Sequence, residues 1–258
     1  MRFIIAILSL LLLARPALAE NFNDAQKQEI GEVVKTYLLA HPELLKDMIE
    51  KLKSKEDADA AAEQGAAVAT SAKNIFHDQL DGVVGNPQGD VTVVEFLDYN
   101  CGWCKKSIKA MQELVKKDPQ LRVVIKEWPI FGYTSEYAAS AATASVKQNK
   151  YWAFHQALFE ANLPHPQQDD EATRAAGEAA VEKIAKSVGI DVAKMKADMK
   201  DKAVVDNLAN TAKLASALKF TGTPGFLINK NVYPGYLELA VMEKEIGKER
   251  ANGVCKDC

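Results

Sequence analysis

Two of the four cysteines in the chain are separated by only two residues, in the segment Cys101–Cys104 with the sequence CGWC. The pair follows a segment with the pattern of a strand and stands at the start of one with the pattern of a helix. Free backbone N–H groups and the helix dipole favour an anion at that point, so we expect the first thiolate to be stabilised. The spacing also lets the second thiol attack a mixed disulfide formed on the first. The pair therefore predicts thiol–disulfide exchange.

A structural disulfide and half of a zinc site are the other interpretations of this pair. A permanent bridge across so short a loop would add little stability, because the entropic gain grows with loop length. A zinc site would need a second pair, and the other two cysteines, Cys255 and Cys258, are much further along the chain than zinc-binding pairs usually are. Redox chemistry is the interpretation that we adopt.

The elements around the pair predict an α/β frame. Val91–Leu97 is strongly apolar, as buried strands are, residues 104–117 have a helical pattern, and Leu121–Ile125 is a second strand. A strand, a helix and a strand over so short a stretch form a βαβ unit, in which parallel pairing is the default. The dithiol is then placed at the carboxyl end of the first strand.

A helical block over residues 133–220 is inserted into this frame. The pattern predicts helices over 136–150, 152–161, 170–187 and 191–218, with a break allowed in the last. The frame then resumes with short strands over 225–228 and 232–233 and a helix over 237–246. Asp81-Gly82 and Gly85-Asn86-Pro87 are predicted as turns.

The segment before the frame predicts a helical extension, over residues 20–53, and a connector over 54–81. Asn23 can cap a first helix with Gln26 three residues on, and a second helix is expected to begin at Pro42. Each helix carries an apolar stripe, whereas the connector is rich in alanine and charge. The stripe could pack on the body of its own chain or against other copies of the extension.

The first 19 residues predict a cleaved secretory signal peptide. A basic start is followed by an apolar run over residues 3–14 and by the small-x-small sequence Ala17-Leu18-Ala19. The run is much shorter than the roughly 20 residues that cross a bilayer, which argues against an anchor. Export would place the cysteines in an oxidising compartment.

Composition excludes several classes of protein. The chain has 258 residues, of which 48% are hydrophobic and 26% charged, so it can bury a core and is not a disulfide-packed miniprotein. Its 32 basic and 35 acidic residues give a formal net charge of −3. Nothing in this balance indicates binding to nucleic acid or to an anionic membrane.

Motifs along the chain resemble the DsbA family of thioredoxin-fold thiol–disulfide oxidoreductases. The resemblance covers about Gly82 to Gly247, and residues 23–52 resemble the N-terminal extension of its ScsC-type, copper-sensitivity subgroup, some members of which trimerise through it. The motifs that carry the resemblance are Phe96–Cys104, Phe131-Gly132 with Ser135-Glu136, Tyr151-Trp152 with His155, and Thr221–Phe226.

The resemblance assigns roles to individual residues. Cys101 matches the exposed nucleophile and Cys104 the buried resolving cysteine, which together form the redox disulfide. Pro224 matches a cis-proline, and Thr223 before it matches a variable residue that faces the dithiol and pairs with the substrate backbone. Trp103, between the cysteines, is expected to be exposed and to contact unfolded substrate chains.

Glu95 is an acid in the middle of the apolar strand, where a charge is costly to bury. Alternation along the strand puts it on one face with Val93 and Leu97. The resemblance implies a buried acid near the resolving thiol that accepts and returns a proton during exchange. The other interpretation is a glutamate of an edge strand that reaches solvent. Asp98 is predicted as a strand-end turn residue that could shape the entrance to the site.

Cys255 and Cys258 match no position of the family. They could form a second disulfide, act as a redox partner for Cys101, or supply two soft ligands for Cu(I), and no metal site is assigned with them. His155 is predicted to be packed or capping, and Trp128 and Trp152 to be packing residues. No cofactor is expected.

The sequence as a whole predicts a periplasmic thiol–disulfide oxidoreductase, and Thr223 with the Gly-Trp pair favours a disulfide isomerase. A dithiol oxidase and a copper-binding or copper-tolerance protein that uses the same thiols are the alternatives. The expected partners are unfolded or misoxidised exported proteins, a membrane thiol reductase or oxidase, and further copies of the chain, with a trimer favoured.

Overall fold

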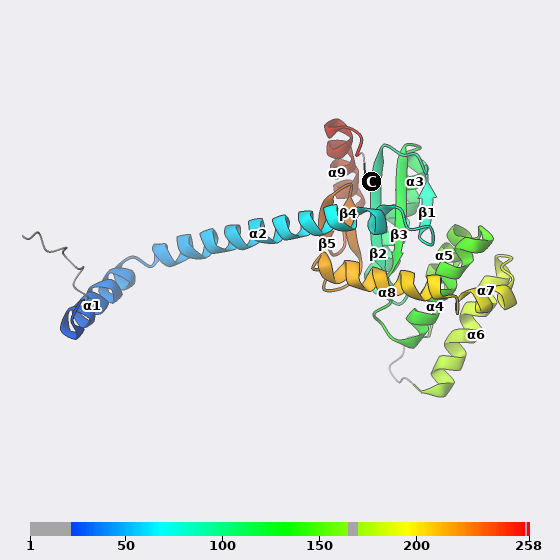
Figure 1. Cartoon of the computed structure of the whole chain (residues 1–258), viewed down its shortest axis with the longest axis horizontal. Helices are drawn as coiled ribbons and strands as arrows, with labels where there is room; N and C mark the ends of the chain where they lie inside the picture. The colour runs from blue at the N-terminus through cyan, green and yellow to red at the C-terminus, as the bar shows by residue number, and fades with distance from the viewer. Residues whose placement is uncertain (1–21, 165–169, 256) are drawn as a thin grey trace, which may run out of the picture. The chain divides into compact units, whose positions relative to one another are not determined.

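A computed structural model describes residues 22–164, 170–255 and 257–258. These residues form two compact units, the first ending at Ala58 and the second beginning at Asp59. The predicted signal peptide is outside the described residues. In chain order (Figure 1) the elements are α1 (Asp24–Ala40), α2 (Glu43–Phe76), β1 (Gly82–Gly85), β2 (Val91–Leu97), α3 (Gly102–Lys117), β3 (Leu121–Glu127), α4 (Tyr133–Ser145), the 3-10 turn η1 (Val146–Gln148), α5 (Tyr151–Glu160), α6 (Glu171–Ser187), α7 (Val192–Asp198), α8 (Lys202–Ala217), β4 (Gly225–Ile228), β5 (Asn231–Pro234) and α9 (Leu239–Asn252).

The first unit contains α1 and the beginning of α2. Asn23 caps α1 in a reciprocal capping box with Gln26, with hydrogen bonds of 2.9 and 3.0 Å. The helix ends just before Pro42, as predicted. Large apolar side chains of both helices are exposed, namely Ile30, Val33, Val34, Tyr37, Leu38, Leu39, Leu45, Met48, Ile49 and Leu52.

Helix α2 runs without a break through the predicted boundary at residue 54. Val68, Ile75 and Phe76 are buried in the second unit, and Gln64 Nε2 donates to the carbonyl oxygen of Leu218 over 2.9 Å. The last turns of α2 are therefore part of the core that supports the sheet.

The second unit is built on a five-stranded sheet in the order β1-β3-β2-β4-β5. β2 and β3 are parallel, which confirms the predicted βαβ unit, and the other neighbouring strands are antiparallel. The strand β1 was not predicted, although turns were predicted at both of its ends, and the chain does turn just before and just after it. Its two valines are flanked by glycines, and this pattern favours a turn. The segment is a strand because it pairs with β3.

Helices cover both faces of this sheet. Apolar residues of α3, α5 and α9 pack on the face that carries Val91, Val93 and Leu97, whereas α8 and the end of α2 pack on the face that carries Val94 and Phe96. This confirms the predicted mixed α/β class. Among the described residues, no helix is both long enough and apolar enough to cross a membrane.

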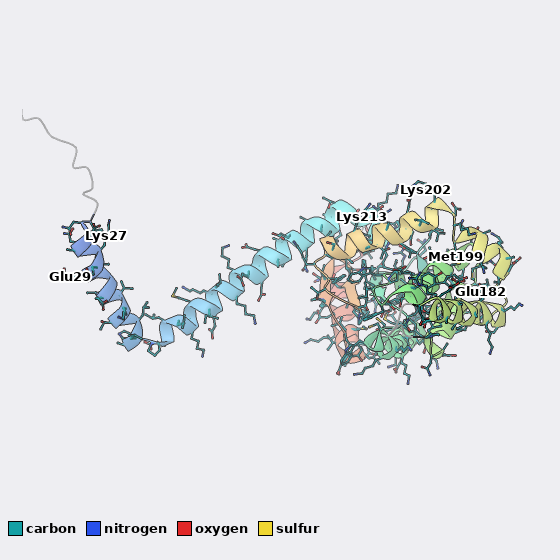
Figure 2. All side chains as sticks on the ribbon, turned by 90° about the horizontal axis from the view of Figure 1, so that it is seen from below. Lys27, Glu29, Glu182, Met199, Lys202 and Lys213 are labelled. Atoms are coloured by element: carbon teal, nitrogen blue, oxygen red, sulfur yellow. A yellow bond between two sulfur atoms is a disulfide. The ribbon has the colours of Figure 1, made fainter. Side chains whose placement is uncertain are left out.

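Helices α4 to α8 occupy the stretch that was predicted as an inserted block. The break allowed in 191–218 is present, because α7 and α8 are separate helices and the side chain of Asp201 caps α8. Helices α4 to α7 lie together beside one end of the sheet (Figure 1). Figure 2 shows Lys202 at the start of α8 and Lys213 further along it.

Candidate active site

The dithiol is positioned by the end of β2 and the start of α3. Cys101 is the N-cap of α3, and the backbone N–H of Cys104 donates to its Sγ over 3.4 Å. In its thiol form, Cys101 Sγ donates to the carbonyl oxygen of Thr223 over 3.2 Å. Cys101 is only 3% exposed. The expectation of an exposed nucleophile is therefore corrected: the sulfur is turned into the helix terminus and against the Thr223 backbone.

The two thiols have opposite acidities. A hydrogen bond from the Cys104 side chain, together with backbone N–H groups at the start of α3, lowers the pKa of Cys101 to about 6. Burial raises the pKa of Cys104 far above its ordinary value, and the hydrogen bond to Cys101 and the charge of Glu95 act in the same direction. At neutral pH Cys101 is the thiolate and Cys104 the thiol, which suits attack by the first and later resolution by the second.

Thr223 and Pro224, in the loop directly before β4, lie against the dithiol. The peptide bond between them is cis. β4 begins at the next residue, and its Gly225 pairs with Phe96 of β2, so this loop and the dithiol are at the same end of the sheet. The Oγ1 atom of Thr223 is buried and has no hydrogen-bond partner among the described residues.

Glu95 is buried on β2, between β3 and β4, where it pairs with Ile125 and Phe226. The interpretation as a glutamate of an edge strand is wrong, because β2 is the central strand of the sheet. Burial raises the pKa of Glu95 to about 8. A hydrogen bond with the Ser107 side chain lowers this pKa, and the negative charge of Cys101 raises it further. One carboxylate oxygen, Oε2, has no partner among the described residues.

Asp98 is the strand-end turn residue that the sequence predicted, and it also ties the dithiol loop to a distant segment, a role that the sequence did not reveal. Its Oδ1 accepts from the N–H of Asn100 and from Ser135 Oγ, each over 2.7 Å. Its Oδ2 accepts from the N–H groups of Ile130 and Phe131 over 2.7 and 3.0 Å. This carboxylate therefore ties the dithiol loop to the segment that enters α4. The partners that could have indicated it lie more than thirty positions away in sequence.

Trp103 is 57% exposed beside the dithiol. Its ring is 5.3 Å from that of Tyr236, measured between ring centroids, and Lys106 Nζ is 5.2 Å from the first centroid and 4.5 Å from the second. Tyr236 and Lys106 were not predicted as site residues. Together the three side chains form an amphipathic surface next to Cys101.

Cys255 and Cys258 are joined by a disulfide in the structure. The main-chain oxygen of Cys258 accepts from Thr92 Oγ1 and from Arg122 Nη1, each over 3.1 Å. Thr92 stands near the start of β2, at the opposite end of the strand from Cys101. The interpretation of this pair as a direct redox partner for Cys101 in the same chain is therefore wrong.

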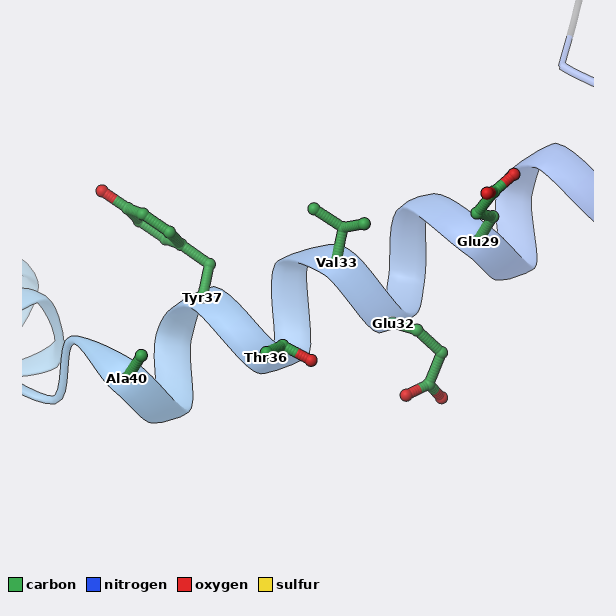
Figure 3. Close-up of a pocket in the computed structure, with 6 residues that line it drawn as sticks. All are labelled: Glu29, Glu32, Val33, Thr36, Tyr37 and Ala40. Carbon is green, nitrogen blue, oxygen red and sulfur yellow. The ribbon is translucent and has the colours of Figure 1, made fainter.

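Other predicted residues take structural places. His155 is fully buried and packed among aromatic rings, as predicted. Along α1, the side chains of Val33 and Tyr37 project from one side of the helix and that of Glu32 from the other (Figure 3). Within the described ranges, no group of three or more His, Cys, Asp or Glu side chains could hold a metal ion.

A free dithiol at a helix N-terminus, beside a cis-proline loop at the same end of a mixed sheet, defines a thioredoxin-fold redox protein. Residues 92–247 match the DSBA-like thioredoxin domain, and the chain belongs to this family. Residues 26–58 match a second domain, described as the copper resistance protein ScsC N-terminal domain.

Solved structures extend this likeness. A thioredoxin-like oxidoreductase from Silicibacter pomeroyi is 38% identical, with a TM-score of 0.61, 69% of this chain covered and 97% of the other. BcfH from Salmonella enterica Typhimurium is 26% identical, with a TM-score of 0.70 and coverage of 88% and 96%. ScsC from Proteus mirabilis, in a transitional conformation, is 26% identical, with a TM-score of 0.60 and coverage of 90% and 98%.

Curated relatives share only one part of their length with this chain. A Na(+)/H(+) antiporter, NhaA 3 of Salinispora tropica, is 27% identical over 157 residues, which are 60% of this chain and 22% of the antiporter. The chain spans about a quarter or less of the length of the curated relatives that it matches.

Proposed function

We propose that the protein is a periplasmic thiol–disulfide oxidoreductase that acts on exported proteins, with disulfide isomerisation as its main reaction. The observation that carries the proposal is the opposed pair of thiols, Cys101 with its pKa lowered to about 6 and Cys104 with its pKa raised. Membership of the DSBA-like family and the likeness to a thioredoxin-like oxidoreductase support it.

In the reaction, the Cys101 thiolate attacks one sulfur of a substrate disulfide. A bond forms between Cys101 and that sulfur, the substrate bond breaks, and the other substrate sulfur leaves as a thiolate. If a second substrate thiolate then attacks the mixed disulfide, Cys101 is released and no net oxidation occurs. If Cys104 attacks instead, the substrate is reduced by two electrons and the Cys101–Cys104 disulfide forms.

Neighbouring residues assist these steps in the proposal. Glu95 takes the proton that Cys104 loses when it attacks, and returns it when the dithiol is regenerated. The Thr223 backbone pairs with the substrate main chain, and Trp103 offers an apolar contact to an unfolded segment. Isomerisation requires reduced Cys101, which in an oxidising compartment implies a membrane thiol reductase as partner. An oxidase would instead require a membrane oxidase.

Ribonuclease refolding separates the two directions. The reduced protein should restore activity to scrambled ribonuclease, whereas Cys101→Ser should not. Recovery from fully reduced ribonuclease alone, by the oxidised protein, would overturn the isomerase proposal in favour of a dithiol oxidase. Loss of all activity in both assays would overturn exchange itself.

A role in copper tolerance is the second candidate, favoured by the match of residues 26–58 to the N-terminal domain of a copper resistance protein. The free cysteines Cys101 and Cys104 carry sulfur atoms that, once deprotonated, are soft ligands that suit Cu(I). Anaerobic Cu(I) titration of the wild type and of the Cys255→Ser/Cys258→Ser variant tests it. Affinity no greater than that of a small dithiol would end this candidate.

A further inference from the structure

A second buried acid belongs to a polar cluster next to the dithiol loop. Glu127, at the end of β3, accepts hydrogen bonds at Oε1 from the hydroxyl groups of Tyr99 and Tyr151, each over 2.7 Å. The Tyr99 hydroxyl is also 2.9 Å from Nδ1 of His155, and that of Tyr151 is 3.4 Å from the same atom. All four side chains are buried. The exchange mechanism above uses none of them.

Counting protons shows which form of the cluster satisfies its donors. Burial lowers the pKa of His155 to about 3, so the ring is neutral and carries one proton. If Glu127 is ionised, both tyrosines donate to its Oε1 and His155 donates from Nδ1 to the oxygen of Tyr99. Only two acceptors, Glu127 Oε2 and His155 Nε2, then lack partners among the described residues. Unpaired buried acceptors are tolerated better than unpaired donors.

The protonated form of Glu127 has one donor too many. A proton on Oε2 faces no acceptor among the described residues. A proton on Oε1 must be donated to a tyrosine oxygen, and when that oxygen is the one on Tyr99, the Tyr99 proton turns to His155 Nδ1. The histidine proton must then sit on Nε2, which is unpaired. Protonation therefore either leaves an unpaired donor on Glu127 or reverses the hydrogen bonds around one of the two tyrosines, Tyr99 or Tyr151.

The ionised form has the opposite cost, since it leaves a charge in the protein interior. Burial raises the pKa of Glu127 to about 8, and the negative Asp98 and Asp81 act in the same direction, while the two tyrosine hydroxyls lower it. The cost of burying the charge and the cost of an unpaired donor oppose each other. The cluster can therefore change its proton content near neutral pH.

Tyr99 connects this cluster to the nucleophile. It is two residues before Cys101 and packs in the same apolar cluster as both thiols, with its ring 4.9 Å from that of Phe159. In the same loop, the N–H of Cys101 donates to the carbonyl oxygen of Asp98 over 3.1 Å. A change in the Tyr99 hydroxyl bond would therefore reach the short backbone segment that places Cys101 at the start of α3.

We propose that Glu127 is a positioning residue for the dithiol, which holds the loop of residues 98–101 through the Tyr99 hydroxyl and changes the reactivity of Cys101 when it gains or loses its proton. The inference rests on the proposed exchange at Cys101 and adds a second buried acid to Glu95. When Glu127 is ionised, the Tyr99 hydroxyl donates to it, and the loop then holds Cys101 in the position in which its thiolate reacts faster.

Alkylation of Cys101 by iodoacetamide between pH 5 and pH 10 tests this inference. The Glu95→Gln variant serves as the background, because the pKa of Glu95 is also raised to about 8 and its titration would overlap. In that background we expect the rate of alkylation per Cys101 thiolate to rise roughly two- to threefold around pH 8. This second rise comes in addition to the first one, which the ionisation of Cys101 itself causes. The double variant Glu95→Gln/Glu127→Gln should lack the second rise.

Matched variants separate positioning from a general loss of structure. Glu182→Gln removes another carboxylate that accepts from a tyrosine hydroxyl, that of Tyr137, over 2.8 Å, and it should leave the second rise in place. Tyr99→Phe keeps Glu127 but removes the connection to the loop, so it should abolish the rise even if Glu127→Gln does not fold. A second rise that persists in Glu127→Gln or in Tyr99→Phe, or that is missing in Glu95→Gln alone, would overturn the inference.

This experiment needs no protein substrate, so its outcome is independent of the ribonuclease assays. A failed ribonuclease assay with the second rise present would refute the proposed function and leave the coupling of Glu127 to Cys101 standing. The reverse result would refute the coupling alone.

Discussion

At the scale of single residues, the pKa values of the two thiols depend on one hydrogen bond between their sulfur atoms. The Cys104 thiol donates to the Cys101 thiolate, which lowers the pKa of Cys101 and raises that of Cys104. The backbone N–H groups at the start of α3 add to the first effect. The same bond that prepares the nucleophile therefore protects the resolving thiol from early ionisation.

Replacement of Cys104 tests this account. Cys104→Ser keeps a hydroxyl donor, whereas Cys104→Ala removes it. We expect the pKa of Cys101, measured by thiolate absorbance, to be about one unit higher in the alanine variant than in the serine variant. Equal pKa values in the two variants would show that the helix terminus alone stabilises the thiolate.

Glu95 should affect the resolution step. In the proposed mechanism its ionised form accepts the Cys104 proton, so the exchange rate of the wild type should rise as the pH passes through about 8. Glu95→Gln should be about tenfold slower at the upper end of this range and should lack the rise. Stopped-flow measurements of tryptophan fluorescence across the pH range would check this, and identical profiles would remove Glu95 from the mechanism.

The same variant has a predicted effect on stability. The pKa of Glu95 is raised from 4.5 to about 8 on folding, so the folded state holds this proton more tightly than the unfolded state. Its contribution to stability is full below about pH 4.5 and is lost as the pH rises through 8. Urea unfolding should therefore show a smaller loss of stability from pH 5 to pH 9 in Glu95→Gln than in the wild type. An equal loss would contradict the raised pKa.

At the scale of elements, two cations of β3 hold the end of α2 against the sheet. Arg122 Nη2 donates to the carbonyl oxygen of Phe76 over 2.5 Å, and Lys126 Nζ donates to that of Asn74 and to the carboxylate of Asp81. Positive groups are favourable at the C-terminus of a helix. Asp81 also accepts from Asn207 of α8 over 3.1 Å, so three elements meet at this cluster.

Lys126→Met should destabilise the protein by about 3 kcal/mol, because it leaves Asp81 buried without its cation. The double variant Asp81→Asn/Lys126→Met should recover part of this loss, since no charge is then left unpaired. Urea unfolding at pH 7 measures both. A double variant that is no more stable than the single one would contradict the assignment of the cost to the unpaired charge.

The sequence predicted the elements with strong local patterns and missed features made by distant contacts. The strand Val91–Leu97 and the helix after it follow from hydrophobic periodicity, and the cysteine motif and Thr223-Pro224 carried the resemblance. β1 was missed because only pairing with β3 makes its short Gly-Val-Val-Gly segment a strand. The Glu127 cluster was missed because its hydrogen-bonded partners are up to 56 positions apart.

At the scale of the whole molecule, the exposed apolar residues of the first unit predict self-association. We propose that copies of the chain pack through α1 and the start of α2, with a trimer favoured, as the resemblance to the ScsC type implies. The apolar side chains along both helices are large and exposed, and solvent is a poor environment for so many of them on one short unit.

Substitutions in α1 test this proposal in the full chain. Val33→Glu/Tyr37→Glu should convert the oligomer to a monomer in light scattering, because it replaces two exposed apolar side chains, which project from the same side of α1 in Figure 3, with charges. Lys35→Glu, a charge substitution outside that pair, is the matched control and should keep the oligomer. A wild type that is already monomeric would refute the proposal.

The central claim is that Cys101 attacks disulfides and Cys104 resolves the product, and capture of the intermediate tests it most directly. The Cys104→Ser variant should accumulate a mixed disulfide with a peptide that contains one disulfide bond, and mass spectrometry should locate the adduct at Cys101. The wild type should release the peptide in reduced form. No adduct at Cys101, or an adduct only at Cys255 or Cys258, would contradict the account.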